Sequence, residues 1–406
     1  MKRVVVTGIG MINALGNDKE SAFENICAGK SGVCKITQFD ASQFPVQIAA
    51  EVKDFDPVDV VKDAKDIKKM DRFIQLGLKA AKEAISDAKI DLNNFDSTEF
   101  GVSSGAGIGG LPNIEKNSNV CLTRGPRRIS PFFIPSALIN MLGGMVSIEH
   151  NLKGPNIASV TACAASTHAI IEAAKTIMIG EAKAMLAVGA ESAICPVGIG
   201  GFAAMKALST RNDDPLRASR PFDKERDGFV MGEGSGALVL EEYESAKKRG
   251  AKIYAEIVGF GQSGDAFHIT APTLEGPLLA MRKAHKMAGE PKIDYINAHG
   301  TSTPTNDRNE TAALKELFKG SVPPVSSTKG QIGHCLGGAG AIEAVICLMA
   351  MERNLMPPTI NQIVKDEECD LDYIPNVARE KELKFVMSNS FGFGGTNGSI
   401  IFKKID

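Results

Sequence analysis

Apolar runs rich in β-branched residues alternate with long helical patterns along the chain. Strands that are apolar on both faces are typical of α/β proteins, in which helices cover both sides of a sheet. The runs predict strands at residues 3–7, 100–104, 157–161, 184–188, 237–241, 255–260, 295–298, 386–389 and 399–402. Because no low-complexity tract or Ser/Pro-rich linker divides the chain, we expect its parts to pack against one another.

Two predicted helices are apolar almost all round, as expected of helices buried inside a protein. The first covers residues 164–180 and the second residues 338–351, where Glu343 is the only charge. Each follows a strand-like segment, at 156–162 and 322–328 respectively. This repetition predicts an α/β protein of two duplicated halves related by a pseudo-twofold axis.

The composition excludes several classes of protein. The 406 residues contain 46 Lys and Arg against 48 Asp and Glu, a net charge of −2, whereas a nucleic-acid-binding protein normally carries a basic excess. With 43% hydrophobic residues, the chain can form a large core in about two to three domains or one two-part body. Its longest apolar run, residues 344–351, is well short of the ~20 residues that span a bilayer, so we expect no membrane association. The first six residues weakly resemble a signal peptide, but Thr7 and the glycines after it favour a strand and turn.

The eight cysteines lie at irregular spacings without a Cys-x-x-Cys pair. This pattern does not support a zinc ribbon or a thioredoxin-like motif, and it favours reduced thiols in a cytoplasmic protein. Glycine is in excess, at 41 residues, without a Gly-X-Y repeat. We therefore expect the glycines to serve tight turns and close backbone contacts.

Cys163 lies at the predicted junction between a strand and the first apolar helix. A thiol at a helix N-terminus faces unpaired N–H groups, which favour the thiolate and hence a nucleophile. Most free cysteines are instead small core residues, so position alone leaves both interpretations open.

Two of the six histidines occupy glycine-flanked loop positions of the kind that build active sites. His299 follows a predicted strand, and His334 precedes the second apolar helix, whereas the other four, His168 among them, lack this context. Glycines also surround two phenylalanines in residues 388–398, where a turn with inward N–H groups would form an oxyanion hole. An ordinary glycine-rich connection is the alternative for that segment.

Three other classes of site have partial matches. Residues 101–105 match the Gly-x-Ser-x-Gly of serine hydrolases and residues 105–110 match the Gly-x-Gly-x-x-Gly of dinucleotide-binding enzymes. Both motifs need a following helix, and the glycines and Pro112 that follow argue against one. A metal site is also conceivable, although its ligands have no recognised spacing: His299, Asp307, His334 and Cys335.

Taken together, these segments resemble the β-ketoacyl-acyl-carrier-protein synthases of the thiolase superfamily. The resemblance covers the whole chain and rests on residues 4–10, 161–163, 299–303, 333–334 and 391–397. Within the family, two further segments resemble the type II, elongating enzymes, namely residues 107–111 and 125–133. The Cys-His-His set also differs from the Cys-His-Asn set of the initiating type III enzymes.

The resemblance implies a thiolase-like fold, in which duplicated α/β halves form a five-layered α-β-α-β-α body. The first half would be residues 1–251, with the nucleophilic cysteine, and the second residues 252–406, with both histidines. It also implies a homodimer, and an acyltransferase that carries out a decarboxylative Claisen condensation in fatty acid elongation. No separate cofactor is implied, because phosphopantetheine arrives on the acyl carrier protein.

In the reaction that the resemblance implies, Cys163 takes the acyl chain as a thioester. Malonyl carrier then loses CO₂ and attacks this thioester to give a 3-oxoacyl chain two carbons longer. Backbone N–H groups of Cys163 and Phe393 would hold the acyl oxyanion, while neutral His299 and His334 would hold the malonyl thioester. Lys329 would orient the histidine region electrostatically.

Further residues match family positions around the reacting groups. Ile108 matches a wall of the acyl pocket and Phe393 its gate, while Thr301 and Thr303 match residues that bind the pantetheine arm. The other substrate-binding and supporting residues that the resemblance implies are Phe391, Thr270, Glu343 and Asp307. Because a buried carboxylate on an apolar helix is costly, we expect Glu343 to have a partner.

The carrier protein of this family is acidic, so we expect a basic docking surface. If residues 58–73 form a helix, basic side chains share one of its faces at steps of three and four. They are Lys62, Lys65, Lys69 and Arg72, with Lys68 near the border. A charged stripe is usually only a solvated face, but Arg127, Arg128 and Lys206 match basic positions near the family's entrance. Docking is therefore the better interpretation.

Other functions near this family stay open. A chain-length-factor-like subunit is catalytically silent and loses the cysteine, which is present here as Cys163. A degradative thiolase would use a second cysteine in the C-terminal region, and residues 389–395 contain none. A polyketide-type ketosynthase is a further alternative.

Overall fold

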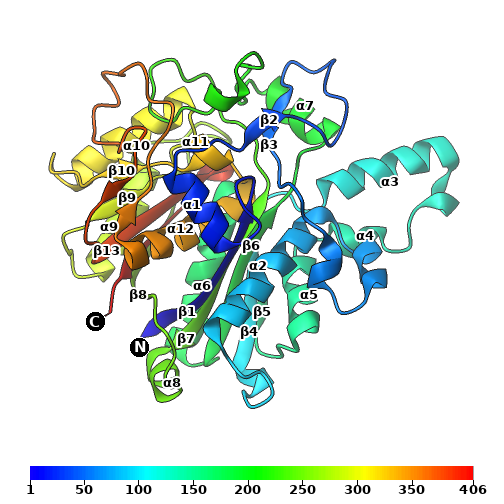
Figure 1. Cartoon of the computed structure of the whole chain (residues 1–406), viewed down its shortest axis with the longest axis horizontal. Helices are drawn as coiled ribbons and strands as arrows, with labels where there is room; N and C mark the ends of the chain where they lie inside the picture. The colour runs from blue at the N-terminus through cyan, green and yellow to red at the C-terminus, as the bar shows by residue number, and fades with distance from the viewer. Residues whose placement is uncertain (406) are drawn as a thin grey trace.

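The computed structural model describes residues 1–405, and its main feature is a mixed sheet in the order β10-β9-β13-β14-β8-β1-β7-β6-β4-β5 (Figure 1). Its strands are β1 Val4–Asn13, β4 Phe100–Gly105, β5 Asn156–Ser159, β6 Ala184–Glu191, β7 Gly234–Glu242, β8 Ala255–Gly264, β9 Tyr295–Asn297, β10 Val325–Ser326, β13 Phe385–Gly392 and β14 Thr396–Lys403. Two small sheets pair β2 Val33–Lys35 with β3 Ile48–Ala50, and β11 Leu355–Met356 with β12 Arg379–Glu380.

The helices lie between and around these strands. The α-helices are α1 Lys19–Cys27, α2 Arg72–Ala88, α3 Leu111–Arg124, α4 Phe133–Ala137, α5 Met141–His150, α6 Ala165–Ile179, α7 Pro196–Ala204, α8 Tyr243–Lys248, α9 Glu275–Met287, α10 Pro304–Leu317, α11 Lys329–Ile332 and α12 Ala339–Arg353. The 3₁₀ turns are η1 Pro57–Val60, η2 Ala64–Lys69, η3 Ser97–Glu99, η4 Pro126–Arg128, η5 Ala162–Ala164, η6 Pro215–Arg217, η7 Leu336–Gly338 and η8 Phe393–Gly395. None of these helices is long and apolar enough to cross a membrane.

The sheet consists of two five-stranded parts with the same topology. In the N-terminal sheet, β5-β4-β6-β7-β1, the strands β5, β4 and β6 are parallel, and β7 is antiparallel to both β6 and β1. The C-terminal sheet, β10-β9-β13-β14-β8, repeats this order and these directions strand for strand. Within residues 1–405, the two sheets join where Val5 and Val6 of β1 pair with Glu256 and Ala255 of β8. The predicted duplication is therefore confirmed.

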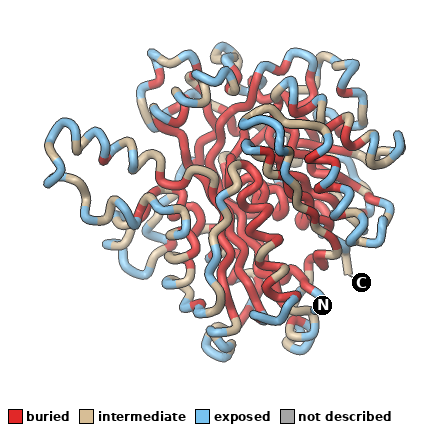
Figure 2. Tube along the Cα trace, turned by 180° about the vertical axis from the view of Figure 1, so that it is seen from behind, coloured by how far each residue is buried: buried red, intermediate tan, exposed pale blue. Residues whose placement is uncertain are grey.

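Two helices that are apolar almost all round form the middle layer. α6 and α12 pack on each other, and each contacts strands of both sheets. α2 and α5 cover the outer face of the N-terminal sheet, whereas α9, with α10 beside it, covers that of the C-terminal sheet. These five layers match the thiolase-like architecture expected from the sequence, and Figure 2 shows buried residues running through the centre of the body.

Glycines let helices lie directly on the two central strands. At Gly8 and Gly10 of β1, an added Cβ would lie 2.2 Å from backbone oxygens of α2. Gly259 and Gly261 of β8 face α9 in the same way, at 2.3 and 2.0 Å. The sequence prediction of a strand ending at residue 7 is wrong, because these glycines are contact points inside a long strand and not a turn.

The predicted helix over residues 58–73 is also wrong. That segment consists of the short turns η1 and η2, and α2 begins only at Arg72. The carboxylates of Asp56 and Asp63 accept hydrogen bonds from the backbone N–H groups of Val58 and Lys65. Such local capping competes with a continuous helix.

A helix does follow the glycine-rich segment at 105–110, contrary to the sequence prediction. Gly110 caps α3, and Pro112 lies in its first turn, where the missing proline N–H costs no hydrogen bond. Ser103, the serine of the Gly-x-Ser-x-Gly match, is fully buried within β4. It therefore lacks the exposed position of a hydrolase nucleophile.

Candidate active site

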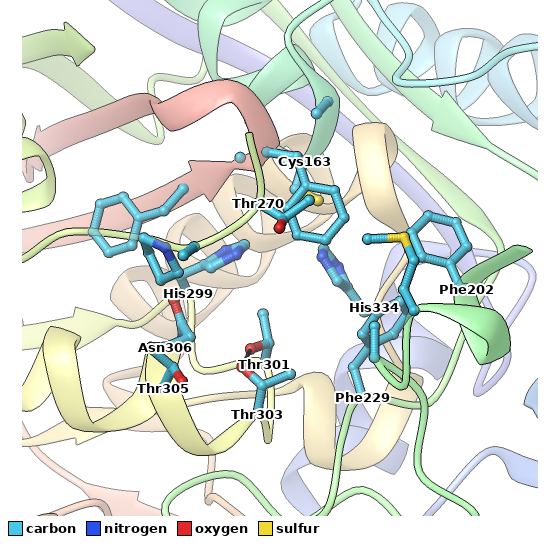
Figure 3. Close-up of a pocket in the computed structure, with 18 of the residues that line it drawn as sticks. Cys163, Phe202, Phe229, Thr270, His299, Thr301, Thr303, Thr305, Asn306 and His334 are labelled. Atoms are coloured by element: carbon cyan, nitrogen blue, oxygen red, sulfur yellow. Dashed lines mark hydrogen bonds between the residues drawn. The ribbon is translucent and has the colours of Figure 1, made fainter. Parts of the chain in front are cut away.

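A cavity of about 430 Å³ is lined by residues of both halves of the chain, most of them from loops and turns. It brings together nine residues predicted to be catalytic or to bind substrate: Ile108, Cys163, Thr270, His299, Thr301, Thr303, His334, Phe391 and Phe393. Figure 3 shows the imidazole rings of His299 and His334 pointing into the space beside the sulfur of Cys163. Lys329, Glu343 and Asp307 are buried behind this lining.

Cys163 lies in turn η5, directly before helix α6. The preceding Ala162 has φ of 49°, and its left-handed backbone turns the chain from β5 into the helix. The backbone N–H groups of Phe393 and of Cys163 itself face the thiol. Burial nevertheless raises the pKa of the Cys163 thiol to about 12, against the opposing effect of Lys329. The prediction of a thiolate favoured by the helix N-terminus is therefore wrong for the free protein, because desolvation is the larger effect.

His299 and His334 come from different loops of the C-terminal half. His299 follows β9, and Glu310 accepts hydrogen bonds from the backbone N–H groups of His299 and Gly300 at 2.9 and 2.8 Å. His334 follows α11, and the two ring centroids are 5.4 Å apart at an angle of 84°. Burial lowers the pKa of both imidazoles well below the usual value, and the nearby Lys329 lowers it further. Both rings are therefore neutral and can donate one N–H into the cavity.

Lys329 and Glu343 form an ion pair with side chains that are each only 1% exposed. The pair joins the start of α11 to helix α12, and it supplies the partner that the sequence predicts for Glu343. Burial raises the pKa of Glu343 to about 7, and Lys329 opposes that rise. The ammonium thus has two effects, because it pairs with Glu343 and also keeps the histidines neutral.

The glycine-rich turn η8 forms one wall of the cavity. Gly394 and Gly395 have φ of 78° and 69°, a conformation that favours glycine. The ring of Phe393 is partly exposed and lies 6.4 Å from that of Phe202. The Phe391 ring lies edge-on to His299 at 5.5 Å.

The threonines and Asp307 occupy two different environments. The hydroxyls of Thr301 and Thr303 lie 2.9 Å apart at the cavity. The Asp307 carboxylate accepts the backbone N–H of Phe222 at 2.8 Å and lies 3.5 Å from the guanidinium of Arg226. Asp307 thus supports the backbone around the site.

Sequence analysis missed Glu191, which ends the apolar strand β6. Its fully buried carboxylate accepts the backbone N–H groups of Gly107 at 2.6 Å, Gly109 at 2.8 Å and Gly337 at 3.1 Å. It therefore connects the loop that carries Ile108 to the turn before α12. The one available signal is an acidic residue at the end of an apolar strand, and no motif distinguishes it.

Most of the predicted docking residues are exposed, namely Lys65, Lys68, Arg127, Arg128 and Lys206. Lys206 also lines the cavity. Lys69 is half-buried and pairs with Asp66, and Arg72 binds Glu233 through two hydrogen bonds of 2.9 Å. Arg72 is therefore not part of a basic helix face, which corrects the sequence prediction.

The sequence matches two family descriptions: "Beta-ketoacyl synthase, N-terminal domain" over residues 1–246 and "Beta-ketoacyl synthase, C-terminal domain" over residues 254–362. It is 54% identical to the 3-oxoacyl-[acyl-carrier-protein] synthase 2 of Coxiella burnetii, over all of this chain and 99% of that protein. The protein of the same name from Vibrio harveyi is 49% identical over the same shares.

Solved structures show the same similarity. A β-ketoacyl synthase from Burkholderia phymatum superposes with a TM-score of 0.94 at 37% identity, over the whole of both chains. A type II polyketide ketosynthase in complex with its acyl-carrier protein superposes with a TM-score of 0.91 at 33% identity, again over both whole chains.

Proposed function

The chain belongs to the β-ketoacyl synthase family, and from this we propose that it is a 3-oxoacyl-acyl-carrier-protein synthase of type 2. It is an acyltransferase that extends an acyl chain by two carbons with malonyl carrier protein in fatty acid elongation. The observation that supports this most directly is the cavity in which the Cys163 thiol faces two neutral histidines.

In the first half-reaction, the sulfur of Cys163 attacks the thioester carbonyl of the acyl carrier. The bond from that carbonyl to the carrier's sulfur breaks, and the carrier leaves as a thiol with the proton of Cys163. The N–H groups of Cys163 and Phe393 stabilise the intermediate oxyanion. Because the free thiol has a raised pKa, its proton leaves only as the attack proceeds.

In the second half-reaction, malonyl carrier occupies the same cavity. Its carboxylate leaves as CO₂, and N–H groups of His299 and His334 stabilise the enolate that forms on the thioester oxygen. The enolate carbon attacks the acyl group on Cys163, and the carbon–sulfur bond breaks. The 3-oxoacyl carrier leaves, and the thiolate of Cys163 takes a proton from water. Thr270, Thr301 and Thr303 hold the pantetheine arm. Because that arm arrives on the substrate, the proposed reaction needs no separate cofactor.

The decisive experiment mixes the purified protein with acyl carrier and malonyl carrier and analyses the carrier by mass spectrometry. We expect one 3-oxoacyl product, two carbons longer than the acyl chain, and an acyl adduct on Cys163. Absence of both would contradict the proposed function. Products from several successive condensations would instead support a polyketide-type ketosynthase, a class to which one structural neighbour belongs.

We further propose that the acidic carrier docks on the exposed basic residues around η2 and η4. The ammonium groups of Lys68 and Lys69 lie 5.9 and 5.8 Å from the ring of Phe132, in the segment that follows η4. Lys206 extends the positive charge to the cavity. KM for the carrier should rise with ionic strength, because salt screens exposed charges.

We also propose a homodimer. Strand β5 is at the edge of the sheet, where Ile157 and Val160 are 40% and 55% exposed. Helix α3 extends from the body and buries only Asn117 (Figure 1), although a lone helix of this length is marginal in water. A second copy of β5 and α3 would cover both surfaces. Analytical ultracentrifugation should show a dimer, and Ile157→Lys should shift it towards monomer.

Two further proposals concern organisation and location. We infer that the chain divides into halves at residues 251 and 252, and the gap between the two family matches, from 246 to 254, supports this boundary. We place the protein in the cytoplasm, which is consistent with eight free cysteines.

A further inference from the structure

His168 is a buried histidine on the first turn of α6, and both of its ring nitrogens have a partner. Nδ1 lies 2.7 Å from the hydroxyl of Thr161, just before the turn that carries Cys163. Nε2 lies 3.1 Å from the backbone carbonyl of Asn397, just after the glycine-rich turn. One side chain thus bridges two segments that are far apart in the sequence.

These contacts determine the tautomer. A carbonyl oxygen only accepts hydrogen bonds, so Nε2 of His168 carries the proton and donates to Asn397. Nδ1 is then the acceptor, and the Thr161 hydroxyl donates to it. Burial lowers the pKa of His168, which favours this neutral ring.

The two bridged segments each contribute one donor to the proposed oxyanion hole. The N–H of Cys163 belongs to the first segment and the N–H of Phe393 to the second. Thr396 adds a second link, because its hydroxyl donates to the carbonyl of Thr161 at 3.0 Å. An oxyanion hole works only when its donors are already in place, so a connection between the segments affects the rate directly.

We propose that His168 is a positioning residue that holds the Cys163 turn against the glycine-rich turn and thereby sets the geometry of the oxyanion hole. This inference rests on the proposed function. His168 takes no part in proton transfer or covalent chemistry, and its effect is confined to steps that place negative charge on the acyl oxygen. Decarboxylation of malonyl carrier uses His299 and His334 and is independent of His168.

The two bonds can be removed one at a time. In His168→Gln, the amide nitrogen replaces Nε2 and keeps the bond to Asn397, whereas in His168→Asn the amide oxygen replaces Nδ1 and keeps the bond to Thr161. His168→Ala removes both bonds. Thr161→Val removes only the hydroxyl and leaves the histidine unchanged.

Two rates are measured for each variant. The first is formation of the acyl adduct on Cys163, followed by intact-protein mass spectrometry. The second is CO₂ release from malonyl carrier alone. A residue that merely stabilises the fold would change both rates together, whereas a residue that positions the oxyanion hole changes the first alone.

We expect His168→Ala to slow acylation by about 10- to 100-fold, the range for a misplaced donor, while CO₂ release stays within about twofold. His168→Gln and Thr161→Val lack the same bond and should be slowed alike, by less than His168→Ala. His168→Asn should also be slowed less than His168→Ala. Adding Thr161→Val to His168→Ala should cost little more, because the two residues act through one bond.

His285→Ala is the matched control. His285 also lies on a helix, α9, and its Nε2 contacts a backbone carbonyl, that of Pro291, at 2.8 Å. It lies outside the cavity lining, so this variant should leave acylation unchanged.

Equal loss of acylation and CO₂ release in His168→Ala would overturn the inference, as would unchanged acylation. If His168→Ala fails to fold, Thr161→Val and His168→Gln decide the matter, and unchanged acylation in both would contradict the bridge. Failure of the unaltered protein to acylate or to release CO₂ would instead contradict the proposed function itself.

Discussion

Two segments of the molecule have nearly the same backbone and different chemistry. The first, residues 162–180, is η5 with α6, and the second, residues 336–354, is η7 with α12. Each opens with a residue other than glycine at positive φ, Ala162 at 49° and Leu336 at 45°. Each continues into a buried helix of 15 residues that ends in a left-handed residue, Gly180 or Asn354.

The difference begins one residue after each opening. There the first segment has Cys163, which reaches the cavity, and the second has Gly337. A Cβ at Gly337 would lie 2.1 Å from the backbone nitrogen of Gly107, so no larger side chain fits. The second segment acts instead through His334 just before it and Glu343 within its helix. A duplicated backbone thus provides two equivalent positions, and local packing decides that only one carries a nucleophile.

Burial shifts the pKa values of Cys163 and His334 in opposite directions for one physical reason. It raises the pKa of Cys163 and lowers that of His334, since a low-dielectric environment favours the neutral form of each. Charge is retained in the Lys329–Glu343 pair, where each ion has a partner. We call the side of the cavity with Cys163 and Phe393 the acylating wall, and the side with His299 and His334 the decarboxylating wall. The following predictions test this division.

The largest expected effect is that of Cys163→Ala. Removing the nucleophile should abolish the acyl adduct and reduce condensation by ~10⁵-fold or more, as in other enzymes with covalent intermediates. CO₂ release from malonyl carrier should persist, because His299 and His334 are unchanged. Mass spectrometry of the protein and a CO₂ assay measure the two outcomes, and normal condensation would refute the assignment of Cys163.

His299→Ala and His334→Ala should show the opposite pattern. Each removes one donor to the enolate, so CO₂ release and condensation should fall by ~10²–10³-fold while Cys163 still acylates. The same two assays apply. A variant that lost only acylation would show that its histidine serves the acylating wall.

The pH dependence should differ between the two walls. Because the pKa of the Cys163 thiol is raised to about 12, the thiolate fraction grows about tenfold per pH unit up to that value. Alkylation of Cys163 by iodoacetamide, mapped by peptide mass spectrometry, should therefore accelerate steadily from pH 7 to 10. A plateau near pH 7 would show that the thiol ionises as the helix N-terminus alone predicts.

The rate of CO₂ release should not change with pH in the neutral range. The histidines have a pKa well below the usual value, so they stay neutral as pH falls from 8 to 6. We expect the rate at which the Cys163→Ala variant releases CO₂ from malonyl carrier to be constant over that range. A loss near pH 6.5 would show that at least one ring has an ordinary pKa.

The smallest expected effect is that of Gly394→Ala in the glycine-rich turn. Gly394 has φ of 78° and open space around it, so alanine adds about 1 kcal/mol of strain without a clash. If the turn moves during acylation, the acylation rate should fall several-fold while the urea midpoint changes little. Gly250→Ala is the matched control, since Gly250 has φ of 67° and equally open space outside the cavity lining. Equal effects of both variants on acylation would exclude a role as a gate.

Local patterns in the sequence were sufficient for much of this protein. Two apolar helices, the strands that precede them and the glycine-flanked histidines each depend on neighbouring residues, so the duplicated α/β organisation, Cys163 and the two histidines could be proposed from them. The other lining residues, such as Ile108 and Thr301, followed only from the family resemblance. Errors arose where local signals compete. In residues 56–71 aspartate caps interrupted an expected helix, and at Gly8 a strand continued through glycines that a helix covers.

Residues that act through distant contacts could not be found in this way. Glu191 binds two segments that only the fold brings together, and His168 links segments more than 220 residues apart, as the separation of 229 between His168 and Asn397 shows. Neither residue belongs to a recognisable motif, because the distant partners of both are backbone groups that carry no sequence signal.

The sequence by itself therefore determined the fold class and the main reacting groups, since these depend on periodicity and on side-chain chemistry, and its ordered motifs gave the resemblance to the family. The tertiary structure alone decided their electrostatic state. Cys163 is a protonated thiol and the histidines are neutral because helices α6 and α12 are packed between two sheets, which removes water from both walls of the cavity. Burial depends on every layer of the fold at once, so no local pattern predicts it.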